Sequence, residues 1–111
     1  MKAFITTCLA AFVAANTNAD DTTGIFPGTD QWKTGLITID KANDDIFYWV
    51  FQSRQDTYAT DPLVMWLTGG PGCASEVALF YENGPYFFES DGSLGVNQYS
   101  WNAISNLLFV D

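Results

Sequence analysis

The feature that most constrains this chain is an uninterrupted apolar run that passes directly into a glycine-rich turn. Leu63–Leu67 (LVMWL) contains no polar residue, and Thr68–Gly72 (TGGPG) follows it at once. A continuous apolar run of this length predicts a strand that is covered on both faces, as in a parallel sheet between helices. Three glycines and a proline cannot continue a strand. A tight, irregular loop with exposed backbone must therefore follow it.

The segments before this strand predict a surface lead-in and a hairpin. Asp20–Thr34 is polar and contains Gly24, Pro27 and Gly28, which indicates a surface segment. Leu36–Ile39 and the aromatic and β-branched Ile46–Ser53 predict two antiparallel strands. Three tryptophans at strand spacing are expected to pack in the core rather than to stack on sugars. They are Trp32, Trp49 and Trp101.

The segments after the glycine loop predict a helix and a second buried strand. Ser75–Glu82 contains good helix formers, Ser75 is a suitable N-cap, and Asn83–Pro85 ends the helix. Tyr86–Glu89 predicts a short extended piece and Ser90–Gly95 a turn. Asn106–Val110 predicts another buried strand, which we expect at an unpaired edge of the sheet. This order of elements favours an α/β fold over an all-β module.

The composition excludes several classes of function. The 111 residues include no histidine, so no Ser-His or Cys-His pair and no histidine metal site lies within this chain. The formal net charge of −9 argues against nucleic acid or an anionic membrane as a partner, because both require a basic face. No metal or other cofactor is expected.

The N-terminus predicts a secretory signal peptide. Lys2 precedes the uncharged apolar run Ala3–Ala15, which is shorter than the roughly 20 residues that span a bilayer. Cleavage is expected after Ala19, with Ala15 as the alternative. Residues 20–111 would then carry a net charge of −10, since Lys2 is lost, and would keep one cysteine, Cys73. The expected location is the secretory pathway, extracellular or lysosomal and vacuolar, with no membrane association after signal removal.

The glycine loop allows more than one interpretation from its residues alone. No Gly-Lys-Ser/Thr is present, and Ser75 stands where a dinucleotide fingerprint needs a third glycine. The remaining functional use of such a turn is an oxyanion hole, because one donor in α/β-hydrolases comes from the loop after the third strand. A structural turn without a ligand is the alternative.

Four blocks in order resemble the serine carboxypeptidase family. Pro62–Ser75 (PLVMWLTGGPGCAS) is similar to its W-L-N-G-G-P-G-C-S-S signature. The other three blocks lie before and after it, and together the four cover essentially all of Gly35–Asp111. They are Ile46–Arg54, Phe80–Pro85 and Tyr99–Asp111. The resemblance implies an incomplete α/β-hydrolase sheet, with an N-terminal antiparallel hairpin leading into parallel strands and one early helix.

The resemblance also implies site residues. Gly70 matches the glycine whose N–H supplies half of the oxyanion hole, and Glu82 matches the glutamate that helps to bind the terminal carboxylate of a peptide substrate. Trp66 and Gly69 match positions in the same carboxylate pocket. Cys73 matches a cysteine that pairs with one far downstream.

Two departures from the family pattern affect this site. Thr68 replaces the commoner asparagine, whose amide donates to the substrate carboxylate, and some members of the family do carry threonine. A hydroxyl donates one hydrogen bond with a shorter reach, so specificity here is expected to differ. Ala74 replaces a serine. No serine in the chain has glycine at both −2 and +2, so the nucleophile elbow and the rest of the triad are absent.

The sequence therefore predicts a signal peptide over residues 1–19 and the N-terminal part of a serine carboxypeptidase-like domain over 20–111. The expected substrates are peptide or protein C-termini, and the 111-residue chain alone is expected to be inactive. The alternatives are a small secreted aromatic-rich binding module and an acyltransferase-type member of the same family.

Overall fold

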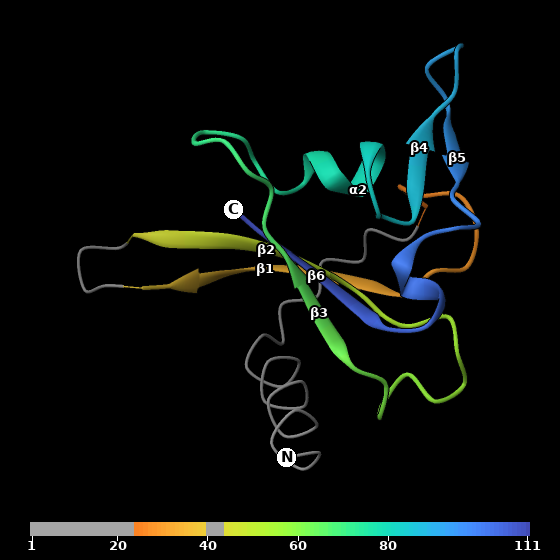
Figure 1. Ribbon diagram of the computed structural model, residues 1–111, viewed down its shortest axis with the longest axis horizontal. Helices are drawn as coiled ribbons and strands as arrows, with labels where there is room; N and C mark the ends of the chain where they lie inside the picture. The colour runs from red at the N-terminus through yellow and green to blue at the C-terminus, as the bar shows by residue number, and fades with distance from the viewer. Residues whose placement is uncertain (1–23, 40–43) are drawn as a thin grey trace.

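The computed structural model describes residues 24–39 and 44–111, in which a four-stranded mixed sheet is the main element. The sheet order is β1-β2-β6-β3 (Figure 1). Its strands are β1 (Trp32–Thr38), β2 (Asp45–Phe51), β3 (Leu63–Trp66) and β6 (Asn106–Val110). β1 pairs antiparallel with β2, β2 antiparallel with β6, and β3 parallel with β6. The predicted hairpin leading into parallel strands is confirmed.

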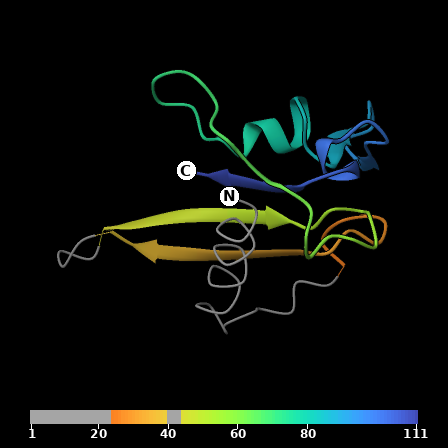
Figure 2. The same ribbon diagram turned by 60° about the horizontal axis from the view of Figure 1, so that its bottom comes forward.

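The remaining elements lie together on one side of this sheet (Figures 1 and 2). They are the helix α2 (Val77–Tyr81), the short hairpin of β4 (Tyr86–Phe88) and β5 (Leu94–Val96), and the 3₁₀ turn η1 (Trp101–Ala103). The described residues thus form a mixed sheet with little helix. The region predicted as a turn over Ser90–Gly95 includes the start of β5, because Leu94 and Gly95 pair with Phe88 and Phe87.

The main core lies between the sheet and α2 with β4. The alternation along β2 and β6 directs Phe51, Leu107 and Phe109 to this face, where they meet Leu79 and Tyr86. All five are fully or almost fully buried, and burial of each such side chain contributes about 2–3 kcal/mol. The opposite face carries a smaller cluster of Tyr48, Val50 and Leu108. β6 is therefore buried on both faces, as its apolar run predicts.

The described part of the lead-in lies at the surface, as predicted, but its Phe26 side chain also packs against the core. The Phe26 ring stacks on Tyr86 with centroids 4.3 Å apart and an interplanar angle of 7°. It also contacts Trp32 and Trp49 at 5.3 and 5.2 Å. Trp32 itself lies in β1, which begins before the predicted strand. One aromatic residue in a polar segment gives no periodic signal, although it packs against the core.

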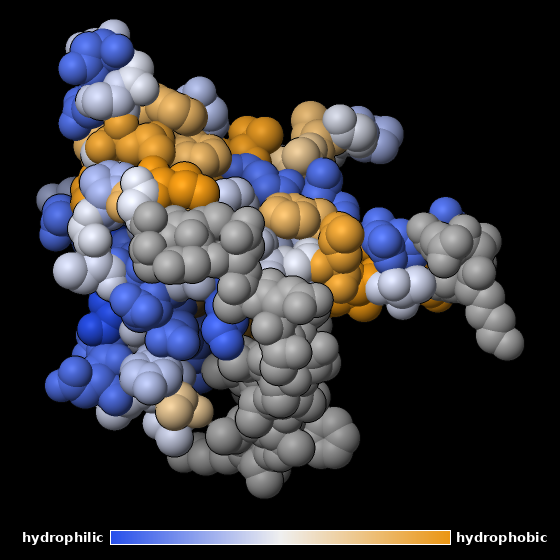
Figure 3. Space-filling view, turned by 180° about the vertical axis from the view of Figure 1, so that it is seen from behind, coloured by the Kyte–Doolittle hydropathy of each residue, from blue (hydrophilic) through white to orange (hydrophobic). Residues whose placement is uncertain are grey.

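Two predictions about the sheet edges are wrong. β6 is not an edge strand, because it lies between β2 and β3. β3 is the edge strand, and it is not covered on both faces, since Met65 is 56% exposed. The apolar run indicated burial, but no described element packs outside β3. Along the other edge, hydrophobic side chains gather over the outer part of the β1–β2 hairpin (Figure 3).

A cluster of hydrogen-bonded polar side chains links the lead-in to the rest of the fold. The Arg54 guanidinium donates two hydrogen bonds of 2.7 Å to the Asp30 carboxylate, whose side chain is 5% exposed. Asn102 Nδ2 donates to the same carboxylate, and Arg54 also donates to the Asn97 carbonyl oxygen. The hydrogen bond with Asp30 raises the pKa of Arg54. This cluster joins three segments that are distant in sequence, around Asp30, Arg54 and residues 97–102.

Candidate functional site

The glycine-rich loop between β3 and α2 projects away from the body of the molecule (Figures 1 and 2). Its residues from Gly69 to Cys73 are exposed. A Cβ atom on Gly70 would lie 2.8 Å from the backbone nitrogen of Gly72 and 3.2 Å from that of Cys73. Gly72 has φ +87°, a left-handed conformation that favours glycine. The loop therefore requires glycine for geometric reasons at both positions.

The polar atoms next to this loop have few partners. Among the described residues, Trp66 Nε1 and Thr68 Oγ1 are buried and form no hydrogen bond. Buried polar groups are normally paired, and an unpaired one costs about 1–3 kcal/mol. Trp66 is the last residue of β3, and Thr68 follows it by two residues. The Thr68 backbone N–H is paired instead, and donates to Ser75 Oγ at 3.2 Å.

Ser75 does not act as the predicted N-cap. The helix α2 begins at Val77, its N-cap is Glu76, and no side chain caps it. Ser75 is only 4% exposed, and its hydroxyl faces the start of the glycine loop rather than the helix. The helix is a single turn and shorter than predicted, because its backbone hydrogen bonds end in the tight turn at Gly84, whose N–H donates to the Ala78 carbonyl oxygen.

Glu82 lies at the C-terminal end of α2 and is exposed. Its carboxylate forms no hydrogen bond or ion pair with other described residues. The backbone that follows it is firmly held. Ser100 Oγ and the Trp101 N–H donate to the Asn83 carbonyl oxygen at 3.1 and 3.0 Å, and Asn97 Nδ2 donates to the Gly84 carbonyl oxygen at 2.9 Å. The position of Glu82 is thus set through its neighbours.

The glycine loop and the Glu82 segment are connected through two tryptophans. The Trp66 ring meets the Trp101 ring edge to face, with centroids 5.4 Å apart, and Trp101 in turn is hydrogen-bonded to Asn83. Trp101 is 48% exposed, so its prediction as a core residue is wrong. The sequence does not predict this link, because the two tryptophans are far apart in the chain and share no pattern.

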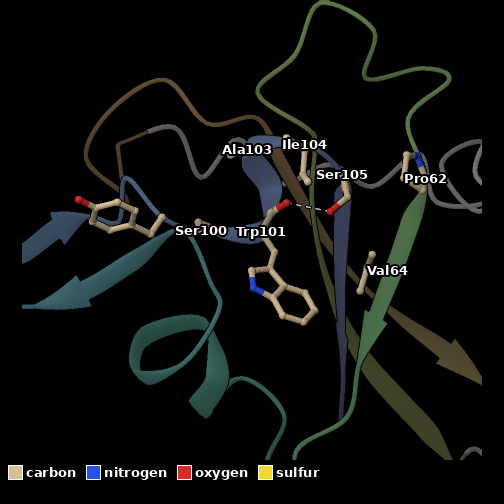
Figure 4. A pocket seen from close by; sticks show the side chains of 8 residues that line it. Pro62, Val64, Ser100, Trp101, Ala103, Ile104 and Ser105 are labelled. Atoms are coloured by element: carbon tan, nitrogen blue, oxygen red, sulfur yellow. Dashed lines mark hydrogen bonds between the residues drawn. The ribbon is translucent and has the colours of Figure 1, made fainter.

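A pocket of about 450 Å³ lies beside Trp101 along β3 (Figure 4). Its lining is apolar and includes Val64, Trp101 and Ile104, which is 73% exposed. It contains none of the predicted site residues. The pocket therefore belongs to the open side of the edge strand and not to the glycine loop.

The charges near the loop are acidic. Burial raises the pKa of Glu76, and the negative charge of Asp111 at the end of β6 raises it further. Cys73 is exposed and is a free thiol in the described part of the chain. Within residues 24–39 and 44–111, no group of three or more His, Cys, Asp or Glu side chains could hold a metal ion. No described helix is long and apolar enough to cross a membrane.

Comparison with known proteins identifies the family. The family description "Serine carboxypeptidase" matches residues 26–111, which is most of the chain. This chain belongs to the serine carboxypeptidase family. The fold class that the geometry indicates, a mixed sheet with a glycine loop after its parallel edge strand, agrees with that assignment.

Individual relatives show how much of the family is represented. A serine carboxypeptidase S10 family member from Dictyostelium discoideum is 44% identical over 78 residues, which are 70% of this chain and 19% of the relative. Serine carboxypeptidase-like 49 of Arabidopsis thaliana is 56% identical over 66 residues, 60% of this chain and 12% of the relative. The chain thus spans less than a fifth of these curated relatives.

A solved structure is similar to the described part of this chain. The prohormone-processing carboxypeptidase Kex1(delta)p from Saccharomyces cerevisiae superposes with a TM-score of 0.63 at 34% identity. The superposition covers 78% of this chain and 20% of that protein. The fold of the described residues is therefore similar to one part of a carboxypeptidase of known structure.

Proposed function

We propose that this chain forms the part of a serine-type carboxypeptidase that binds the oxyanion and the terminal carboxylate of a peptide substrate. The observation that carries the proposal is the glycine loop after β3. There Gly70 has no room for a side chain, and two buried donors beside it, Trp66 Nε1 and Thr68 Oγ1, have no partner among the described residues. Unpaired donors at one end of a strand suit an anionic ligand.

In this proposal the residues bind two different groups of the substrate. The Gly70 N–H donates to the oxyanion that forms during attack on the scissile carbonyl, and one such donor contributes roughly 3–4 kcal/mol to transition-state stabilisation. Thr68, Gly69 and Trp66 donate to the substrate carboxylate. Glu82 binds the same carboxylate. Two carboxyl groups share a hydrogen bond only when one is protonated, so this contact favours acidic pH.

The proposal assigns the nucleophile and its base to residues outside this chain. The 111 residues contain no histidine and no Gly-x-Ser-x-Gly elbow. Hydrolysis needs an activated serine as well as an oxyanion hole. We therefore propose that the 111-residue polypeptide alone has no carboxypeptidase activity. We also propose that Met1–Ala19 directs it to the secretory pathway; this segment lies outside the described residues.

A chimera tests whether this chain is competent in the proposed role. In the chimera, the segment of Arabidopsis serine carboxypeptidase-like 49 that aligns with this chain is replaced by the matching residues of this chain. Release of C-terminal amino acids is then measured at acidic pH. The unaltered Arabidopsis protein, active in the same assay, is the control. We expect the chimera to release the terminal residue from a peptide acid and to discriminate against the peptide amide.

Two results would contradict the proposal. One is a soluble, folded chimera without activity, and the other is equal turnover of the peptide acid and the peptide amide. Glu82→Gln in the chimera separates the roles further. It should raise KM for the peptide acid and weaken the preference for acidic pH, while kcat changes little.

A further inference from the structure

We infer that Ser75 is a positioning residue for the loop that carries Gly70, an inference that rests on the proposed function. Its hydroxyl oxygen accepts a hydrogen bond of 3.2 Å from the backbone N–H of Thr68. Ser75 is 4% exposed, so water does not compete strongly for this bond. The bond joins the two ends of the glycine loop, since Thr68 follows β3 and Ser75 precedes α2.

The loop has little else to fix its conformation. The residues from Gly69 to Cys73 form no backbone–backbone hydrogen bond with other described residues. Three of the five are glycine, and glycine loses more conformational freedom on ordering than any other residue. The tie between Thr68 and Ser75 therefore restricts the segment more than any contact within it does, apart from the close approach of Gly70 to the backbone of Gly72 and Cys73.

The same bond also determines which backbone N–H groups of the loop remain without a partner. It uses the N–H of Thr68 and leaves the N–H groups of Gly69 and Gly70 without partners among the described residues. An oxyanion hole stabilises the transition state only when its donors are fixed before the reaction begins. Ser75 thus acts on the reaction through the loop, and touches no reacting atom itself.

The chain offers a matched control for this residue. Ser53 is 6% exposed, and its hydroxyl accepts a hydrogen bond of 3.2 Å from the backbone N–H of Gln55. Ser53→Ala therefore removes the same kind of bond at the same burial, but at the end of β2. Ser75→Thr keeps the hydroxyl at the position under test.

The experiment measures hydrogen exchange of single backbone amides by NMR in the full chain. In the unaltered protein we expect the Thr68 amide to be protected while the amides of Gly69 and Gly70 exchange freely. Ser75→Ala should accelerate exchange at Thr68 roughly fivefold to tenfold and shift the Gly69 and Gly70 amide signals. Ser53→Ala should leave both unchanged, and Ser75→Thr should restore the protection.

Several results would overturn the inference. One is a Thr68 amide that exchanges freely in the unaltered chain while the β6 amides are protected, which shows that the chain is folded. The others are an equal effect of Ser53→Ala on the loop amides and a failure of Ser75→Thr to restore protection at Thr68. If Ser75→Ala unfolds the chain, protection of the Thr68 amide in the unaltered protein and in Ser75→Thr still tests the inference. Amide exchange does not depend on turnover, so failure of the chimera to hydrolyse peptides would leave this result standing.

Discussion

At the scale of single residues, Gly84 shows how closely the end of α2 packs. A Cβ atom at this position would lie 2.2–2.5 Å from the backbone of Leu79, and backbone atoms of a packed helix cannot move aside. Glu82 lies two residues earlier. The glycine thus determines where the chain leaves the helix, and with it the position of the proposed carboxylate-binding residue.

Gly84→Ala is therefore expected to lower the free energy of unfolding by about 3 kcal/mol or more, as overpacking against backbone does. Urea denaturation followed by circular dichroism measures it. Gly69→Ala is the control for stability, because a Cβ atom there meets nothing within 4 Å and the residue has no left-handed φ. An equal loss in both variants would contradict the packing argument.

The charge on Glu76 predicts a pH dependence of stability. Burial raises its pKa in the folded state, so the folded protein binds the proton more tightly than the unfolded chain does. Stability is then greatest below the unfolded pKa and falls as pH rises through the raised value. Glu76→Gln should unfold at higher denaturant concentration than the unaltered chain at pH 7, and the difference should shrink as pH falls below about 4.

Glu89→Gln removes one negative charge from an exposed position and serves as the control. Its stability difference from the unaltered chain should show no comparable growth between pH 4 and pH 7. If Glu76→Gln gave a constant difference over the same range, the protonation of Glu76 would not be the cause.

Residue-level predictions from the sequence succeeded where a motif fixed the position. The glycine loop, the end of the helix at Asn83–Pro85 and the burial of Asn106–Val110 follow from local chemistry, and the structure confirms them. Ser75 was misassigned as an N-cap and the packing of Phe26 was not predicted, because their partners Thr68 and Tyr86 are brought close only by the fold. The roles of Gly70, Thr68, Gly69, Trp66 and Glu82 remain predictions.

At the scale of elements, the positions of the strands in the chain were predicted better than their places in the sheet. A continuous apolar run marks a strand, but it does not say which neighbour will cover it. β3 and β6 have similar runs, yet β6 is central and β3 lies at the edge. That distinction depends on pairing between segments that are far apart in the chain, which composition does not encode.

The Asp30–Arg54 ion pair joins two segments that no sequence pattern connects. Breaking a buried pair leaves an uncompensated charge, which typically costs 3–5 kcal/mol. Arg54 is exposed, so water screens the charge that Asp30→Ala leaves behind, and we expect a cost of about 1–2 kcal/mol. A double-mutant cycle with Arg54→Ala measures the coupling by urea denaturation. Strict additivity of the two single changes would show that the pair contributes nothing as a pair.

At the scale of the whole molecule, the open edge formed by β3 predicts self-association. Met65 and Leu67 are 56% and 60% exposed beside an unpaired strand edge, and such edges recruit further strands. Met65→Lys should therefore lower the concentration-dependent mass seen by analytical ultracentrifugation. Thr60→Lys adds the same charge at an exposed loop position and should have no such effect. Equal behaviour of the two variants would contradict this role for β3.

The proposed role of the Gly70 N–H as an oxyanion donor is tested by the kcat of the Gly70→Ala chimera. The added Cβ atom must displace the backbone of Gly72, which lies 2.8 Å away, and so moves the donor. Loss of one oxyanion donor lowers kcat roughly 10²- to 10³-fold. We predict a loss of this size with little change in KM and an unchanged fold. An unchanged kcat in the folded Gly70→Ala chimera would show that the Gly70 N–H is not an oxyanion donor.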